Sequence, residues 1–289
     1  NILQEGDIQI RGFKLRLPLD IQFVFTANPE DYTNRGSIVT PLKDRIGSQI
    51  LTHYPESIEV ASKITRQEAK LSAAQQELVH MPNVAYELLE QISFEARDNE
   101  YIDAKSGVSA RLTITALENL FSTAERRALV DGASKTTIRL LDFMGIIPAI
   151  TGKVELVYEG EQEGAAMVAE NLISAAVKNI IEKHLPTMNK LKSGDEANAY
   201  NKVIQWFEQG HSFDIMYSFS DSTYKKALDQ VKPLKQIIED NNLNIEKSDR
   251  YFLMEMILWG LAEHNKLNKE SLIGGFNFAD LFSSYLRGG

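Results

Sequence analysis

The residues whose types could do chemistry begin with the polar cluster Asn28-Pro29-Glu30-Asp31. This cluster follows residues 21–27, a run of mostly β-prone apolar residues that predicts a strand buried on both faces of a mostly parallel sheet. Open α/β sheets place ligand-binding groups at the carboxyl ends of their strands. Asn28 is therefore a candidate site residue, and the alternative is a structural Asx-turn.

Arg45 is a second candidate, because a guanidinium group neutralises phosphate charge. It lies near the far end of residues 40–47, which predict a short helix entered through Pro41. The alternative role is an ion pair within the chain, with Asp44 or Glu30 as the partner.

Arg111 is a third candidate and closes the string Gly107-Val108-Ser109-Ala110-Arg111. The amphipathic pattern of residues 109–121 predicts a helix at this position. The alternative to a site role for this arginine is an ordinary charge on a helix surface.

The elements that must position these residues begin with a predicted β-hairpin. Residues 7–17 alternate apolar and polar side chains about a turn at Arg11-Gly12, and Pro18 ends the pattern. Residues 49–51 are also strand-like. A single strand at residues 21–27 cannot form a sheet, so we expect its partners to precede this chain in a longer protein.

Helical periodicity dominates from Ser57 onward. Residues 57–150 predict a four-helix stretch that ends at residues 145–148, with Ser122-Thr123-Ala124-Glu125 as a capping box that opens one of its helices. Residues 153–158 alternate like a strand, and residues 159–164 predict an acidic turn after it. The apolar positions at helical spacing are Ile58, Ala61, Ile64, Ala85, Leu88, Leu89 and Ile92.

The remainder of the chain also predicts helices. A clear amphipathic helix covers residues 165–184, and further helices lie near residues 199–208, 222–241 and 247–265. Residues 274–286 resemble a docking helix. The recurring aromatic residues sit among aliphatic ones at helical spacing, so we expect them to form a core rather than a binding platform.

Composition excludes several classes of site. The chain has no Cys, which excludes disulfides, thiolate nucleophiles and Cys-based zinc sites. The net charge of −9 disfavours broad nucleic-acid binding, and no apolar run is long enough to span a bilayer. The 5 His never occur at i,i+4 spacing, and residues 210–214 lack the final Gly of a nucleophile elbow. We therefore predict a cytoplasmic protein without a membrane segment or a metal site in this chain.

The order strand, Asn-Pro, loop and Pro-Leu-Lys-Asp-Arg resembles the second half of an AAA+ ATPase core of the MoxR and magnesium-chelatase I-subunit group. In that family a hairpin precedes the sensor-1 strand, and a Leu-x-Asp-Arg segment supplies an arginine finger. The string that ends in Arg111 resembles the family's sensor 2. The resemblance covers about residues 1–156.

The resemblance implies a role for each candidate residue. Asn28 would be sensor 1 and bind the γ-phosphate or the attacking water, and Arg45 would reach the nucleotide of a neighbouring subunit. Arg111 would close the helical lid on the phosphate of its own subunit. The implied cofactors are ATP and Mg²⁺. A finger that acts in trans requires a homo-oligomeric ring, expected to be a hexamer, and a von Willebrand A domain protein is the implied partner.

The chain departs from the family in one respect. It contains neither a P-loop nor an apolar strand that ends in Asp-Glu, which are the Walker A and Walker B motifs. Both motifs lie upstream of sensor 1 in the family. We therefore expect a longer parent protein to hydrolyse ATP and this chain alone to be inactive.

The predicted fold is an α/β remnant of an AAA+ core, with a β-hairpin and sheet strands, followed by mainly helical parts. The predicted domains are the second half of the core at residues 1–55, a helical lid at 56–150 and a mainly helical domain at 151–289. The predicted function is ATP-dependent remodelling of a partner. The alternatives are a non-catalytic interaction module with a degenerate AAA+ core and, less favoured by this acidic chain, an AAA+ transcriptional activator.

Overall fold

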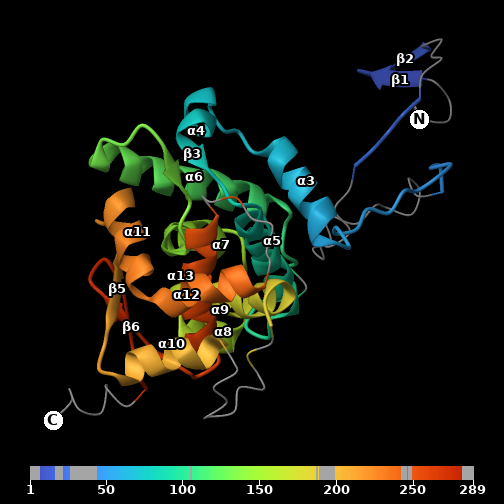
Figure 1. Cartoon of the computed structure of the whole chain (residues 1–289). Coiled ribbons are helices and arrows are strands. Elements are labelled where there is room, and N and C mark those ends of the chain that lie inside the picture. The colour runs from blue at the N-terminus through green and yellow to red at the C-terminus, as the bar shows by residue number, and fades with distance from the viewer. Residues whose placement is uncertain are drawn as a thin grey trace. The chain divides into compact units, whose positions relative to one another are not determined.

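The computed structural model describes residues 7–16, 22–26, 44–104, 106–186, 188, 199–241, 246 and 249–281. The chain forms two compact units, Asn1–Tyr54 and Pro55–Gly289 (Figure 1). The second unit includes both sides of the position 150/151, where the sequence predicts a boundary between the lid and the C-terminal domain. Among the described residues, no helix combines the length and apolar composition needed to cross a bilayer.

The first unit contains the predicted hairpin. Strands β1 (Asp7–Ile10) and β2 (Phe13–Arg16) pair antiparallel, with Ile10 opposite Phe13. Arg11 and Gly12 both have positive φ, 47° and 88°, as a tight two-residue turn between twisted strands requires. The prediction of a hairpin about Arg11-Gly12 is confirmed.

The other strands predicted in the first unit are absent from its described part. Residues 22–26 and 49–51 belong to no strand and are exposed, although the rings of Phe23 and Phe25 stack with centroids 6.2 Å apart. The described residues 22–26 therefore form no buried strand in this chain, where the expected partners are not among the described strands. The physical reason is that a strand needs neighbours for its backbone hydrogen bonds, and no described strand pairs with this segment.

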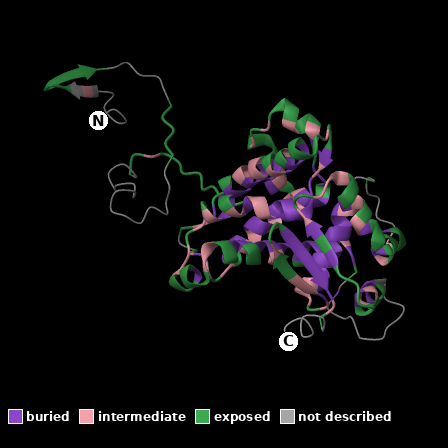
Figure 2. Ribbon diagram, turned by 90° about the vertical axis from the view of Figure 1, so that its left-hand side faces the viewer, coloured by how far each residue is buried: buried purple, intermediate pink, exposed green. Residues whose placement is uncertain are grey.

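The second unit is built around α13 (Arg250–Glu263). Every residue from Phe252 to Leu261 is buried, so this helix is apolar on all sides and other elements enclose it. It packs against α9 (Ala165–His184), whose bounds agree with the predicted helix, and α9 also packs against α5 (Asn83–Asp98). Figure 2 shows this buried centre in purple.

Shorter elements complete the second unit. They are α3 (Ile58–Glu68), α4 (Ala73–Leu78), β3 (Val79–His80), β4 (Thr136–Thr137), the 3₁₀ helix η1 (Leu140–Ile146), α7 (Ile147–Thr151) and α10 (Ala199–Glu208). β3 and β4 form a short parallel pair. The predicted helix end at residues 145–148 is wrong, because η1 continues directly into α7 with Pro148 in its first turn.

Helix α6 (Arg111–Asp131) corrects the predicted capping box. The helix runs without a break through Ser122 and Thr123, and Thr123 satisfies its own hydroxyl by donating to the Asn119 carbonyl. Glu125 accepts a hydrogen bond from Gln75 of α4 instead of capping a helix start. The helix ends where Gly132 adopts a left-handed conformation, φ 66°.

The predicted strand and acidic turn near residue 156 are also wrong. Leu156 makes one isolated antiparallel bridge with Ile102, and the acidic residues that follow form a short helix, α8 (Tyr158–Glu163). Gly160 lets this helix approach the chain at Tyr101 closely, since a Cβ at Gly160 would lie 2.5 Å from the Tyr101 carbonyl oxygen.

The last predicted helices differ in two ways. The expected helix at residues 222–241 is two helices, α11 (Asp221–Gln230) and α12 (Lys232–Asp240), because Pro233 cannot continue a helix but fits a first turn. The described part of the expected docking helix contains strand β7 (Gly275–Ala279), which lies between β5 (Phe213–Met216) and β6 (Asn268–Leu272) in an antiparallel sheet, and residues 282–286 of that prediction lie outside the described residues. The aromatic residues of β7 alternate as in a strand.

Candidate functional site

Arg111 stands at the first position of α6, and its side chain is exposed. The hydroxyl of Ser109 accepts a hydrogen bond from the Arg111 backbone N–H at 3.2 Å, while the Ala110 cap position offers no side-chain acceptor. Among the described residues, the guanidinium of Arg111 has no hydrogen-bond or ion-pair partner. The backbone N–H groups of Arg111 and Leu112 already donate to the Ser109 hydroxyl and carbonyl, so the exposed guanidinium is the group that Arg111 offers to an anion.

The other predicted site residues lie in the first unit. Arg45 is exposed in a turn with Asp44. The described part of the predicted short helix, residues 44–47, is turn and bend, and the part before it lies outside the described residues. Asn28 also lies outside them. Arg45 and Arg111 belong to different units, and Asn28 is not placed.

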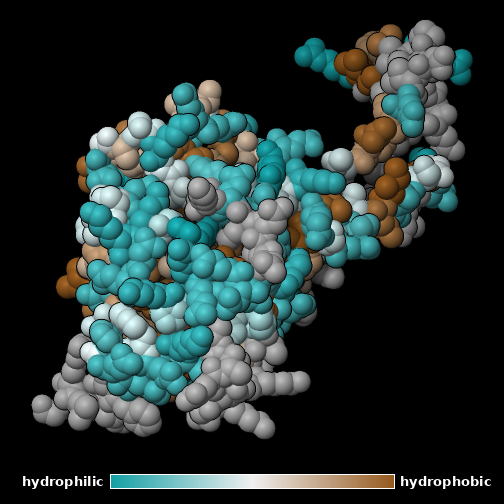
Figure 3. All heavy atoms as spheres, in the orientation of Figure 1, coloured by the Kyte–Doolittle hydropathy of each residue, from teal (hydrophilic) through white to brown (hydrophobic). Residues whose placement is uncertain are grey.

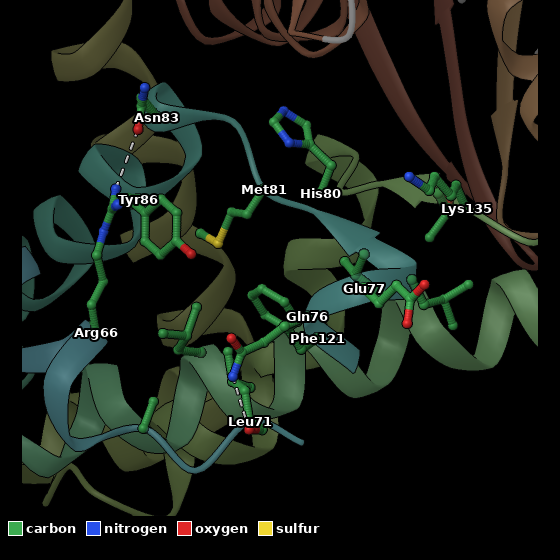
Figure 4. A pocket seen from close by; sticks show the side chains of 15 residues that line it. Arg66, Leu71, Gln76, Glu77, His80, Met81, Asn83, Tyr86, Phe121 and Lys135 are labelled. Carbon is green, nitrogen blue, oxygen red and sulfur yellow. Dashed lines mark hydrogen bonds between the residues drawn. The ribbon is translucent and has the colours of Figure 1, made fainter. Parts of the chain in front are cut away.

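A groove near α3, α4 and α6 is a site that sequence reasoning missed (Figure 4). Its volume is about 580 Å³. Arg66 stacks over the Tyr86 ring, with its guanidinium carbon 3.5 Å from the ring centroid, and donates to Asn83 Oδ1 at 3.3 Å. Burial raises the pKa of the Tyr86 hydroxyl, and the charge of Arg66 opposes this shift.

The groove is apolar inside and charged at its margin. Leu71, Leu117 and Phe121 line it together with Met81 of the loop after β3. Cationic and acidic side chains of the same lining include Lys135 and Glu77, which lie on the side opposite Arg66 in Figure 4. Such a lining suits an amphipathic ligand with apolar and charged parts.

A buried charge network holds α6, η1 and α11 together. Arg127 forms a two-pronged ion pair with Asp142, at 2.7 and 3.2 Å, and also contacts Asp221 at 3.1 Å. Arg139 donates to the same Asp221 oxygen at 2.7 Å and covers the Tyr224 ring. The Arg127 and Asp142 side chains are 7% and 2% exposed, so the network is a structural clamp rather than a ligand site.

Glu255 of α13 lies beside this network and is completely buried. Its carboxylate accepts hydrogen bonds from the Leu140 and Leu141 backbone N–H groups, both at 2.9 Å, and from the Tyr224 hydroxyl at 2.7 Å. Burial raises the pKa of Glu255 to about 7, although these donors favour its charged form. The carboxylate thus caps the start of η1 from a distant helix.

Sequence reasoning could not find the groove or the network, because their members are far apart in the chain. One local signal was available: Arg127 lies among apolar residues on the buried side of an amphipathic helix. A charged residue on such a face predicts a buried partner, although it does not identify Asp142.

The chain matches no protein-family model, no curated protein and no solved structure.

Proposed function

We propose that this chain is part of an AAA+ ATPase of the MoxR and magnesium-chelatase I-subunit group, which couples ATP hydrolysis to remodelling of a partner protein. The observation that carries the proposal is Arg111, an exposed arginine at the first position of the 21-residue helix α6. Its exposed guanidinium offers donors that suit a phosphate oxygen. The preceding unit bears the hairpin and Arg45 in the order that the resemblance implies.

Each residue then has a defined task. Arg111 binds the γ-phosphate of its own subunit, Arg45 reaches the nucleotide of a neighbouring subunit, and Asn28 orients the attacking water. ATP and Mg²⁺ are held mainly by Walker motifs that this chain lacks. An arginine finger in trans requires a ring, so the proposal includes a homo-oligomer, expected to be a hexamer in the cytoplasm, acting on a von Willebrand A domain partner.

The test is the affinity of a fluorescent ATP analogue for the natural protein that contains this chain. We expect Arg111→Ala to weaken binding by about 10- to 100-fold, the usual worth of a hydrogen bond to a charged group. The matched control is Arg126→Ala, which removes an exposed arginine from the same helix far from its start. It should bind the analogue like the wild type.

Two outcomes would contradict the proposal. One is a wild-type protein without measurable affinity for the analogue. The other is an Arg111→Ala variant that binds as tightly as the Arg126→Ala control while its circular dichroism shows a folded protein.

A non-catalytic interaction module is the second candidate, and the exposure of apolar residues in the first unit favours it. Phe13 is 81% exposed, Val24 79% and Ile50 89%. Exposed apolar residues of this kind are typical of a surface that binds another protein. This candidate predicts no nucleotide affinity. It also predicts that Phe13→Ser weakens retention of a partner isolated with the natural protein, whereas Arg45→Ala does not.

A further inference from the structure

His80, Glu246 and Asp249 form a cluster of side chains that the proposed ATPase function does not use. Each offers one ligand atom, and these atoms all lie within 4.8 Å of one another. His80 lies in β3, while the two acidic residues precede α13. The cluster therefore joins two distant segments of the chain, since His80 and Asp249 are 169 positions apart.

The fold fixes the backbone on both sides of the cluster. β3 pairs with β4, and the Ile138 N–H donates to the His80 carbonyl at 2.9 Å. On the other side, the Asp249 N–H donates to the Glu246 carbonyl at 3.0 Å, which holds these two residues near each other. The Leu253 N–H donates to the Asp249 carbonyl, so Asp249 is joined to the central helix.

The side chains combine a buried ligand with exposed ones. His80 Nε2 lies 2.7 Å from Asp249 Oδ1, and these side chains are 41% and 10% exposed. Glu246 is exposed. Two carboxylates and a neutral imidazole carry a charge of −2, which a divalent cation would neutralise. The exposed side gives an ion access from solvent and leaves room for a water ligand.

We propose that His80, Glu246 and Asp249 bind one divalent transition-metal ion, with Zn²⁺ as the best fit. One imidazole and two carboxylates are ligands that Zn²⁺ accepts at about 2.0–2.2 Å, and a fourth position stays open for water. The ion takes the place of the contact between His80 Nε2 and Asp249 Oδ1, and the neutral imidazole then carries its one proton on Nδ1. Glu246 closes the remaining distance by a change of rotamer, which its exposure permits.

The site lies at the edge of the groove rather than inside it. His80 is part of the groove lining, yet its ring projects away from Gln76 and Phe121 (Figure 4). A metal bound there would join β3 to the start of α13. Its open coordination position faces solvent beside a groove that also contains Lys135.

The test is a calorimetric titration with Zn²⁺ of this chain, from which metal has first been removed with a chelator. It measures the stoichiometry and the affinity of binding. We expect one Zn²⁺ per chain. His80→Ala and Glu246→Gln should each weaken binding by at least about 100-fold, because even outer-shell partners of metal ligands are worth about 10- to 100-fold. Glu246→Gln changes an exposed residue, so it tests the site even if variants of Asp249 fail to fold.

The matched control is His184→Ala. His184 Nε2 pairs with Glu87 at 2.8 Å, much as His80 pairs with Asp249, but it belongs to no cluster of three ligands among the described residues. This variant should bind Zn²⁺ like the wild type. Co²⁺ should give the visible absorption of a low-coordinate site in the wild type and lose it in His80→Ala.

The proposal is overturned if the wild type shows no saturable Zn²⁺ binding. It is equally overturned if His80→Ala and Glu246→Gln bind Zn²⁺ as tightly as the His184→Ala control. A bare His80–Asp249 ion pair predicts either result. Neither depends on nucleotide binding, so this test is separate from that of the ATPase proposal.

Discussion

The two units of this chain contain similar apolar residues but differ in how far these residues are exposed to solvent. In Asn1–Tyr54, Phe13 is 81% exposed and Leu51 76%, whereas in Pro55–Gly289 the side chains of Phe143 and Leu88 are 0% exposed. Brown apolar side chains are accordingly prominent on the first unit in Figure 3, and the visible face of the second is mostly teal. Apolar composition alone therefore does not determine burial in this molecule.

This difference in burial indicates which unit contributes most to the stability of the molecule. The second unit encloses α13 on all sides, so its apolar residues are removed from water by contacts within the unit. The first unit has one described hairpin and no described core. If the first unit belongs to an AAA+ core, as proposed, the remainder of that core would cover its exposed apolar residues.

The largest expected difference is between two Phe→Ala substitutions, one in each unit. Phe143→Ala should lower the free energy of unfolding by about 3–5 kcal/mol, because it leaves a cavity in the core. Phe13→Ala should change it by less than about 0.5 kcal/mol, because the ring is already in water. Urea denaturation of this chain measures both. Equal effects of the two substitutions would break the comparison.

A second prediction concerns charge in the core of the second unit. Asp142→Ala leaves Arg127 buried beside only the partly exposed Asp221, and it should cost about 3 kcal/mol of unfolding free energy. Glu239→Ala, in the exposed pair with Lys235, should cost no more than about 0.5 kcal/mol. A loss of under about 1 kcal/mol for Asp142→Ala would show that the clamp does not stabilise the unit.

A third prediction uses pH. Glu90 is 2% exposed, one of its oxygens has no hydrogen-bond partner, and burial raises its pKa to about 7. Between its unfolded pKa of about 4.3 and 7, the folded carboxyl keeps a proton that the unfolded one has lost. The free energy of unfolding therefore falls as pH rises through this window, by up to about 4 kcal/mol.

Glu90→Gln removes this titration. The variant should gain stability relative to the wild type as pH rises from 4.5 to 8, and urea denaturation across that range measures the gain. A measurement at about pH 3 serves as the internal reference, since residue 90 is then uncharged in the folded and the unfolded state of both proteins. A difference between variant and wild type that stays constant with pH would refute the raised pKa.

The smallest predicted effect concerns two serines with opposite positions. Ser72 caps α4, where its hydroxyl accepts from the Gln75 N–H and the Gln75 side chain accepts from the Ser72 N–H. Ser72→Ala should cost about 1 kcal/mol. Ser122→Ala, inside α6, should instead stabilise by a few tenths of a kcal/mol, about the difference in helix propensity. A comparable loss of unfolding free energy in both variants would indicate that Ser122 caps a helix, in contradiction to the structure.

Local signals predicted the parts of the fold that depend on neighbouring residues. The Arg11-Gly12 turn and the bounds of α9 could be read from the sequence because a two-residue turn and a continuous apolar stripe are local patterns. Strand β7 has a local signal in the alternation of Phe276 and Phe278, but its neighbours β5 and β6 could not be read from so short a run.

The candidate site shows the same limit. Arg111 could be selected because its string precedes an amphipathic helix. The pairing of Arg127 with Asp142, and above all of His80 with Asp249, depends on contacts between distant segments that no spacing rule contains. The five histidines were therefore judged only by their spacing in the chain, and the cluster around His80 was missed.

The measurement that tests the central claim most directly is steady-state ATP hydrolysis by the natural protein that contains this chain, with wild type and Arg45→Ala compared. The account predicts Mg²⁺-dependent hydrolysis by the wild type and a fall of about 10³- to 10⁵-fold in Arg45→Ala, the usual worth of an arginine finger. A wild type that does not hydrolyse ATP, or an Arg45→Ala variant that hydrolyses it at the wild-type rate, would contradict the account.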